Sequence, residues 1–506
     1  MKKIPLILSC SLAAAAQAAE YVTYEEFGAV GDGKADDQNA IVAAHAAANE
    51  RGLPVKADDG KTYYIGRGAK VAVVRTDVDF GTASFIIDDR DLENLRAPVF
   101  RIEPSAPSFE VEGVASLAAG QKELGVSLPG PCLVEVENDQ VRQYIRHGLN
   151  QNQGFPQKEV FVADAKGAID PQTPIIWDYS PVTRIQAYPI DTKTLTIRGG
   201  RFKTIANQAE SKYQYHNRGI AVKRSNVRIE GLRHDIGGEG QHGAPYFGFL
   251  GISSCANVTV TGCTFTAHRT YQTIGSAGKT VSMGSYDITA NNAVNVSFVD
   301  CRQTTDINDT RYWGLFGSNY CHNLLYDKCV FSRFDAHMGV ANATIRNSTL
   351  GHQGINAIGF GTFLIENTTV RSVNFFNLRP DYGSTWKGDL IVRNSKFVPA
   401  NGRPVTGTLV NGSSTDSHDF GYPCFMPRRI VFDGLEIDDA RHPQQYEGPN
   451  IFAVFNRGNN GPKYAGKFPY HVTEELVLRN LTVASGKEPV LSPNKYMFRN
   501  VKVVRE

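Results

Sequence analysis

The sequence predicts an all-β protein, a right-handed parallel β-helix with an N-terminal capping helix and a β-rich insertion. A nine-residue pattern, of which Cys255–Cys263 and Ala293–Cys301 are two copies, recurs about every thirty residues between Gly199 and Asn500. Each copy is a short strand with apolar residues at every second position, closed by Asn, Gly or Asp. The 506 residues include 48 glycines, which suits a chain that turns after every strand.

Residues 1–18 have the parts of a secretory signal, with basic Lys2 and Lys3, an apolar stretch and a small-residue end at Ala16–Ala18. We expect cleavage after Ala18 and a secreted or periplasmic mature protein. No later stretch is apolar and long enough for a membrane span. Without Lys2 and Lys3, the 53 Lys and Arg residues fall to 51 and equal the 51 Asp and Glu residues, which argues against a nucleic-acid partner.

Residues 19–88 are expected to form the N-terminal cap and the first coils. The segment Glu26–Asp37 reads EFGAVGDGKADD, and helical spacing follows from Ala40 to Glu50. Its glycines permit a tight turn, Asp36 and Asp37 are placed to cap the helix, and the helix would cover the open end of the sheets. The segment resembles the start of pectate-lyase-like β-helix proteins, whose polygalacturonases and phage tailspikes often open in this way. The resemblance implies the fold and identifies no reaction.

Residues 89–190 break the repeat, and we predict that they form a β-rich insertion packed on the β-helix. They contain strand-like runs such as Pro131–Glu137 and Glu159–Ala163. The stretch Arg142–Asn150 carries two arginines and a histidine. We interpret it as a solvated strand, with cationic substrate contacts as the alternative.

Residues 191–506 are predicted to form the main β-helix, in which each turn adds one strand to each of several parallel sheets. The seven cysteines beyond the leader are an odd number without a C-x-x-C pair, which argues against a disulfide framework and a zinc site. Cys263, Cys301 and Cys329 share one repeat position, so we expect a stack of small buried side chains.

Seven of the twelve histidines fall between residues 216 and 390, which makes this region the best place to look for chemistry. Cys263, Cys301, Cys329 and Ser348 occupy one position of the repeat, and a polar residue follows each of them after eight residues, on four neighbouring coils. We therefore expect these residues to form one column, and counting four residues past the same position places Arg333 and His352 on adjacent coils. The column consists of Tyr271, Asp309, His337 and Asn356.

The catalytic motifs of polygalacturonases are absent, because we find no N-T-D, no D-D at that place and no R-I-K. We favour β-elimination of a uronic-acid polymer, which needs a cation for the C5 carboxylate, a base for the C5 proton and an acid for the leaving oxygen. Arg333 suits the cation and His337 the base, with His352 as a second candidate. The candidate acids are Tyr271, Tyr312 and Tyr382.

Two alternatives stay open. Glycoside hydrolysis needs two carboxylates at a defined separation, for which Asp306, Asp309 and Asp335 are available. A noncatalytic carbohydrate-binding protein or tailspike-like adhesin is the second alternative. The substrate would be an acidic polysaccharide, such as chondroitin or dermatan sulfate, pectin or alginate.

Aromatic, cationic and acidic side chains in the same region are candidates for sugar contacts. Carboxylates also suit Ca²⁺, the one cofactor that we consider. No ordered ligand motif identifies a metal site, and the sequence does not predict an oligomeric state. The candidate substrate-binding residues are Asp309, Asp335, Trp313, Arg379, Tyr382 and His242.

Overall fold

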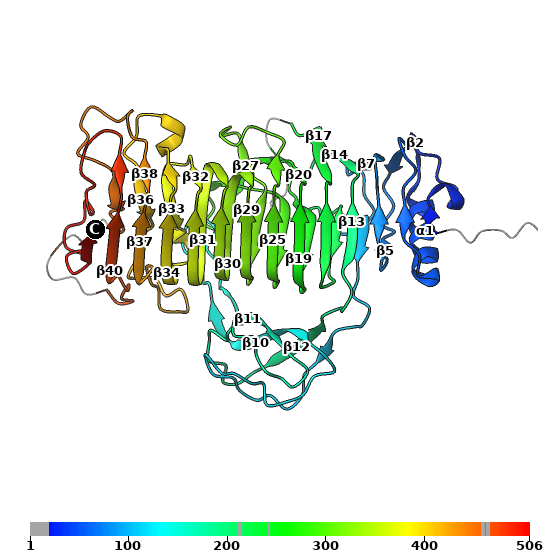
Figure 1. The fold of residues 1–506 in the computed structure, drawn as a ribbon, viewed down its shortest axis with the longest axis horizontal. Helices are drawn as coiled ribbons and strands as arrows, with labels where there is room; N and C mark the ends of the chain where they lie inside the picture. The colour runs from blue at the N-terminus through cyan, green and yellow to red at the C-terminus, as the bar shows by residue number, and fades with distance from the viewer. Residues whose placement is uncertain (1–19, 210–214, 241–242, 457–460, 462–465) are drawn as a thin grey trace, which may run out of the picture.

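The structure is a computed structural model that describes residues 20–209, 215–240, 243–456, 461 and 466–506. The predicted secretory signal, residues 1–18, lies outside the described residues. Within the described ranges, 34 strands join one sheet system in which the coil strands pair in parallel, and they wind along the long axis of the molecule (Figure 1). The prediction of a right-handed parallel β-helix is confirmed. No helix in the described part of the chain is long and apolar enough to cross a membrane.

The N-terminal end of the coil is closed by one α-helix, as predicted. Helix α1 (Gln38–Arg51) buries Ile41, Ala44 and Ala48 and packs on β5 (Ala72–Val74). The Asp36 carboxylate accepts the first helical N–H, that of Gln38, at 3.0 Å. Asp37 is the residue before the helix, but its side chain makes no cap. It accepts the backbone N–H groups of Val30 and Gly31 instead and so holds the preceding loop.

The insertion is a separate four-stranded antiparallel sheet that projects from one side of the coil (Figure 1). It has its own apolar core, and a second cluster joins Leu133 and Val160 to Ala256 and Val294 of the coil. One coil strand, β8 (Phe100–Ile102), lies within the range 89–190, so the chain leaves the coil only after Ile102. The strands of the insertion are β9 (Phe109–Glu110), β10 (Cys132–Gln143), β11 (Phe155–Ala163) and β12 (Arg184–Pro189).

One continuous parallel ladder runs through most of the main coil, with adjacent turns aligned residue by residue except for register shifts in the β30–β31 pair. Its inward side chains are Val, Ile, Leu and Phe, as the period-2 pattern predicts. The strands are β13 (Leu195–Arg198), β16 (Val227–Glu230), β19 (Ala256–Thr261), β25 (Val294–Val299), β29 (His322–Asp327), β30 (Val330–Arg346), β31 (Thr349–Glu366), β34 (Trp386–Arg393), β37 (Arg429–Asp433), β40 (Glu475–Arg479) and β42 (Lys502–Arg505).

The cysteine stack is confirmed. All seven cysteines in the described ranges are free and buried. The thiols of Cys301 and Cys329 donate to backbone oxygens of the preceding coil at 3.4 and 3.2 Å. Burial raises the pKa of the Cys321 thiol to about 12. Five of the seven cysteines, Cys255, Cys263, Cys301, Cys321 and Cys329, therefore fill the interior of the coil as small apolar groups.

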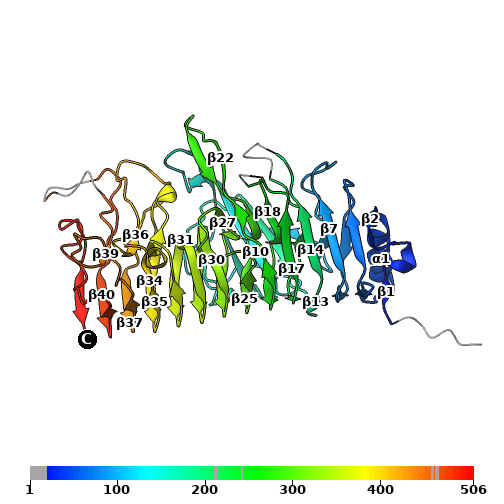
Figure 2. The same cartoon turned by 90° about the horizontal axis from the view of Figure 1, so that it is seen from above.

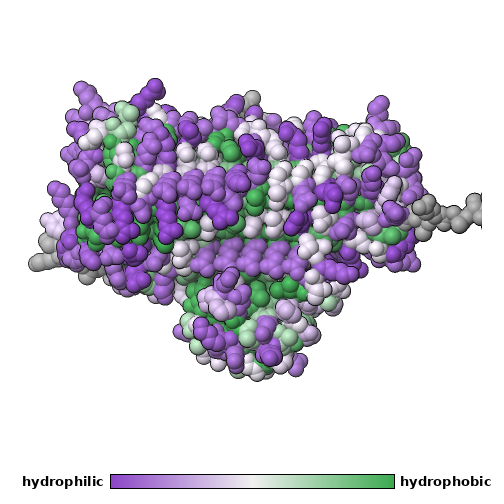
Figure 3. Space-filling view, viewed as in Figure 1, coloured by the Kyte–Doolittle hydropathy of each residue, from purple (hydrophilic) through white to green (hydrophobic). Residues whose placement is uncertain are grey.

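An asparagine ladder lies at the start of the repeated strands. Asn226, Asn257, Asn295 and Asn323 have φ between +56° and +60°, a backbone region that Asn tolerates better than most residues. Each amide nitrogen donates to the amide oxygen of the preceding coil, at 2.9 Å for each of the three steps. Rows of hydrophilic side chains run across the coils on the face shown in Figure 3.

Candidate active site

A central pocket of about 370 Å³ lies on the coil where three parts of the chain meet. The coil contributes β24 (Tyr286–Asn291), β28 (Phe316–Asn319), β30 and the turn η2 (Pro380–Tyr382). A hairpin of β22 (Tyr271–Ile274) and β23 (Thr280–Met283) forms one wall, and β22 stands out from the coil in Figure 2. The lining includes Arg146, Asn150–Asn152, Phe155, Tyr215, Phe247, Ser282, Met283, Tyr286, Trp313, Asn319, His337, Arg379 and Tyr382.

The insertion supplies the third wall through a loop that we call the insertion arm, residues 144–154. Backbone hydrogen bonds fix the arm on both sides: Ile145 donates to Phe420 at 3.1 Å, His147 to Asp381 at 2.9 Å, and Ala277 of the hairpin to Leu149 at 3.0 Å. Arg146 therefore reaches the pocket, and our interpretation of Arg142–Asn150 as a solvated strand is wrong. The cationic-contact alternative fits this placement.

A chain of alternating charges forms one side of the pocket and continues beneath it. Asp335 accepts from Arg333 at 2.6 Å and from Arg379 at 3.0 Å. Arg379 also donates to Asp381 at 3.0 Å, and Asp381 pairs with Arg146 at 2.8 Å. This series of ion pairs contains three arginines and two aspartates, and neither aspartate is a lining residue of the pocket. The pocket surface is therefore cationic.

Burial acts to raise the pKa of both carboxyls, but the arginines outweigh it. Arg333 and Arg379 lower the pKa of Asp335, and Arg379 and Arg146 lower that of Asp381. Asp335 has no exposed side-chain surface. Both carboxylates are therefore ionised and serve to orient the arginines.

The imidazole of His337 lines the pocket, and one of its two nitrogens is hydrogen-bonded within the protein. Its Nδ1 lies 2.8 Å from Asn319 Oδ1, and the Asn319 amide nitrogen donates to Asn291 at 2.7 Å. Asn319 Oδ1 is thus an acceptor, which assigns the proton to Nδ1 and leaves the Nε2 lone pair for a substrate. Burial lowers the pKa of His337 to about 3, helped by the charge of Arg379. The ring is neutral and can act as a base.

Aromatic rings complete the pocket. The Tyr382 ring lies edge-on to His337, with centroids 5.2 Å apart, and the Arg146 guanidinium lies 5.3 Å from the Tyr382 centroid. The Trp313 ring occupies the place that a Cβ at Gly284 would need, and a Cβ at Gly317 would approach the Tyr286 ring to 3.0 Å. Glycine at these two positions therefore makes room for the rings.

The structure separates His352 from His337. His352 lies in a second depression of about 330 Å³ together with Asp309, Arg371 and Arg403. Its two ring nitrogens lie 3.0 Å from the backbone oxygens of Ile307 and Tyr312. The expected joint site of Arg333, His337 and His352 is therefore wrong.

The predicted alignment failed because the coils contain irregularities. Register shifts in the β30–β31 pair place Arg333 opposite Gly354, and Asp335 rather than His337 opposite Asn356. Arg333 and His352 do lie on adjacent coils, as predicted, with Gln353 in contact with both at 3.1 and 3.3 Å, but His352 lines the second depression and not the central pocket. Tyr271 lies in the hairpin outside the parallel coil, is buried, and contacts Tyr215 through its hydroxyl at 3.1 Å. The column of Tyr271, Asp309, His337 and Asn356 does not form.

Two further candidates are too buried to meet a sugar directly. The Arg333 side chain is 3% exposed, and its guanidinium lies 4.6 Å from the Trp313 centroid, beneath that ring. Asp335 is enclosed by its two arginines. The structure leaves Trp313, Arg379 and Tyr382 as lining residues, whereas His242 lies outside the described residues.

Sequence reasoning missed several lining residues. Tyr286 and Asn319 lie at the ends of β24 and β28, two strands outside the nine-residue repeat, so no pattern marked their side chains as functional. Asp381 follows Arg379 by two residues, which is a spacing typical of a local ion pair. Arg146 could not be placed because its distance from the coil depends on how the insertion folds.

The carboxylates suggested for hydrolysis or Ca²⁺ do not converge. Asp309 pairs with Arg311 at 2.5 Å, which lowers the pKa of Asp309 to about 2, and it lies in the depression of His352. Asp306 accepts from the N–H of Asn308 in its own turn. In the described ranges, no cluster of three or more His, Cys, Asp or Glu side chains suited to a metal ion is found.

Comparisons with known proteins support the fold. No family model matches the chain. A KL64-specific capsule depolymerase of Klebsiella phage P510 is 26% identical over 176 residues, which are 28% of this chain and 17% of that protein. The match thus spans about a sixth of the length of this curated relative.

Solved structures match over nearly the whole chain. The gp61 tailspike of Pseudomonas phage phi297 has a TM-score of 0.56 at 12% identity and covers 96% of this chain and 84% of its own. The Gp54 tailspike of Acinetobacter baumannii bacteriophage AP22, solved with a capsular saccharide, has a TM-score of 0.53 at 11% identity, with 96% and 79% covered. The chain has a parallel β-helix fold, and its structural neighbours include phage tailspikes.

Proposed function

We propose that the protein is a secreted polysaccharide lyase that cleaves a uronate-containing polysaccharide by β-elimination in the central pocket. The observation that carries the proposal is His337, a neutral imidazole with a proton-accepting Nε2 beside Arg379 and Arg146, in a pocket in which no described lining residue is a carboxylate. The names of the phage relatives make a bacterial capsular polysaccharide one candidate substrate, besides glycosaminoglycans and pectin.

Arg379 and Arg146 bind the uronate carboxylate. Their counter-ions Asp335 and Asp381 hold the guanidinium groups in place, so little reorganisation is needed when the substrate binds. The two cations stabilise the extra negative charge that develops on the C5 carboxylate when the C5 proton leaves.

His337 Nε2 takes the C5 proton. The electron pair of the broken C–H bond forms the C4–C5 double bond while the C4–O bond breaks, and the leaving oxygen needs a proton. Tyr286 lines the pocket and its phenol can supply this proton, so we assign it the role of acid in place of Tyr271 and Tyr312. The products are one unsaturated end and one new hydroxyl.

Hydrolysis requires two carboxylates at the scissile bond. Asp309 and Asp335 do not offer that arrangement, so we place binding without cleavage second, on the ground that the AP22 tailspike was solved with a capsular saccharide.

The test is to incubate the protein with chondroitin sulfate, hyaluronan, pectin, alginate and purified capsular polysaccharides, and to record the absorbance of the C4–C5 double bond alongside new reducing ends. We expect the two signals to rise together on one class of polymer. Reducing ends without the double bond would show hydrolysis, and binding without either signal would show an adhesin.

A further inference from the structure

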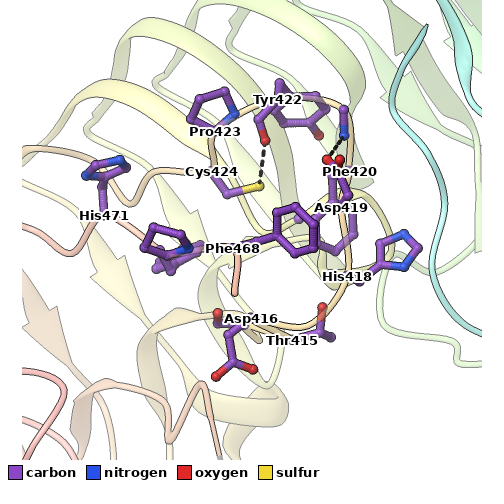
Figure 4. A pocket seen from close by; sticks show the side chains of 15 residues that line it. Thr415, Asp416, His418, Asp419, Phe420, Tyr422, Pro423, Cys424, Phe468 and His471 are labelled. Atoms are coloured by element: carbon purple, nitrogen blue, oxygen red, sulfur yellow. Dashed lines mark hydrogen bonds between the residues drawn. The ribbon is translucent and has the colours of Figure 1, made fainter. Parts of the chain in front are cut away.

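A third depression, which we call the aromatic hollow, lies next to the central pocket and has a volume of about 430 Å³. Loops at residues 414–424 and 468–471 line it (Figure 4). Aromatic side chains form much of its surface, and two carboxylates lie among them. The residues that carry the inference are Phe420, Tyr422, Phe468, Tyr470, Asp416 and Asp419.

The two depressions have opposite charge. Among the residues that the structure describes, the lining of the aromatic hollow contains Asp416 and Asp419 and no Lys or Arg, whereas that of the central pocket contains Arg146 and Arg379 and no Asp or Glu. Asp416 accepts from the Asn456 amide at 2.8 Å, and exposed Asp419 accepts from the Gly421 N–H at 2.7 Å. The ammonium group of Lys467 lies 5.1 Å from the centroid of the Phe468 ring. Lys467 is not a lining residue of the hollow.

The depressions share a wall. Tyr382 lines the central pocket, its neighbour Gly383 lines the hollow, and the Tyr422 hydroxyl donates to the backbone oxygen of Tyr382. His418 lines the hollow, and its ring lies 3.1 Å from the backbone oxygen of Ile145 on the insertion arm. Ile145 directly precedes Arg146. A polymer chain that leaves the central pocket across this wall enters the hollow.

We propose that the aromatic hollow binds an uncharged pyranose of the same polysaccharide chain, so that the substrate is a heteropolysaccharide that combines uronate with neutral or N-acetylated sugars. Aromatic faces pack against the C–H face of a sugar ring, and carboxylates accept hydrogen bonds from its hydroxyls. A uronate carboxylate would meet the exposed carboxylate of Asp419, and such a like-charge contact rejects a wrong ligand. The inference rests on the proposed function for the uronate in the central pocket.

The experiment compares two probes of matched length, unsulfated chondroitin oligosaccharides, in which glucuronate and N-acetylgalactosamine alternate, and oligogalacturonate. Binding is measured by calorimetry on the His337→Ala variant, so that no turnover interferes. We expect chondroitin to bind about tenfold more tightly, a difference of about 1.4 kcal/mol.

Substitutions in the aromatic hollow test whether the preference for chondroitin over oligogalacturonate arises there. Phe468→Ala in the same background is expected to weaken chondroitin binding several-fold and to leave oligogalacturonate binding unchanged, and Asp419→Asn should strengthen oligogalacturonate binding. Tyr21→Ala, an exposed aromatic at the other end of the coil, is the control and should change neither. Equal or tighter binding of oligogalacturonate, absent binding of chondroitin, or an unchanged Phe468→Ala variant would overturn the inference.

The double-bond assay separates this inference from the proposed function. The chondroitin preference without elimination by the unsubstituted protein would refute the lyase and retain the hollow. Elimination from polygalacturonate that Phe468→Ala does not alter, together with equal binding of both probes, would retain the lyase and refute the hollow.

Discussion

His337 and His268 are both enclosed in the protein, yet their surroundings drive their charge in opposite directions. Burial and Arg379 lower the pKa of His337 to about 3. Burial also acts to lower the pKa of His268, but Asp287 at 3.1 Å and Glu239 at 3.6 Å outweigh it and raise that pKa to about 9. A histidine among cations is a neutral base, and a histidine between carboxylates is a buried cation.

The buried cation belongs to a structural network. Asp287 also accepts from His234 at 2.7 Å and from the backbone of Thr266 at 2.9 Å, and His234 contacts Thr204 at 2.9 Å. The network links β14 (Arg201–Ile205), β17 (Arg233–Gly237), β21 (His268–Arg269) and β24, so its role is to hold successive coils together. Of His337 and His268, only His337 lines a pocket that can hold a sugar.

The largest expected effect is on catalysis. The change His337→Ala should lower kcat about 10³-fold, because a general base contributes 10²–10⁴-fold, while circular dichroism shows an unchanged fold. His352→Ala is the matched control and should retain nearly full activity, since its ring contacts the backbone oxygens of Ile307 and Tyr312 and the amide of Gln353, none of which lines the central pocket. Loss of activity in the control, or its retention in His337→Ala, would reverse our choice of histidine.

The next effect is on stability and has opposite signs for the two histidines. The ordinary histidine pKa is about 6.5. His268 stabilises the folded protein fully below pH 6.5, and this contribution is lost as the pH rises toward 9. His337 costs stability as the pH falls from 6.5 toward 3, because only the unfolded chain then takes up the proton. Each slope is about 1.4 kcal/mol per pH unit.

Thermal unfolding from pH 4 to 9 measures both slopes. His268→Gln should flatten the alkaline decline, and His337→Asn should flatten the acid decline. If His268→Gln leaves the alkaline decline intact, the buried cation is not its source.

The smallest effect concerns the insertion arm. Arg146 is partly exposed and one of two cations among the described lining residues, so Arg146→Ala should raise KM about five- to tenfold. It should also lower kcat by a similar factor, because Arg146 stabilises the charge that develops on the C5 carboxylate in the transition state. Steady-state kinetics on the cleaved polymer measures this change, and Arg146→Lys should recover part of it. An unchanged KM would mean that the arm does not contact the substrate.

The sequence was sufficient for the coil because the coil is periodic. Strand positions, the cysteine stack, the capping helix and the insertion all follow from local patterns or their interruption. The site is not periodic, since register shifts in β30–β31 moved Arg333 and His337 out of the expected alignment with their neighbours. The position of Arg146 depended on a contact between segments more than two hundred residues apart, which no local pattern encodes.

The central claim is that a neutral His337, kept neutral partly by the arginines that bind the uronate, is the base. The direct test is the pH dependence of double-bond formation, with kcat/KM reporting the free protein and kcat the complex. We predict that the acid limb of kcat/KM lies well below pH 6.5, and that the limb of kcat lies higher because the bound carboxylate offsets the charge of Arg379 and Arg146. A limb of kcat/KM at or above pH 6.5, or one that stays in His337→Ala, would contradict the account.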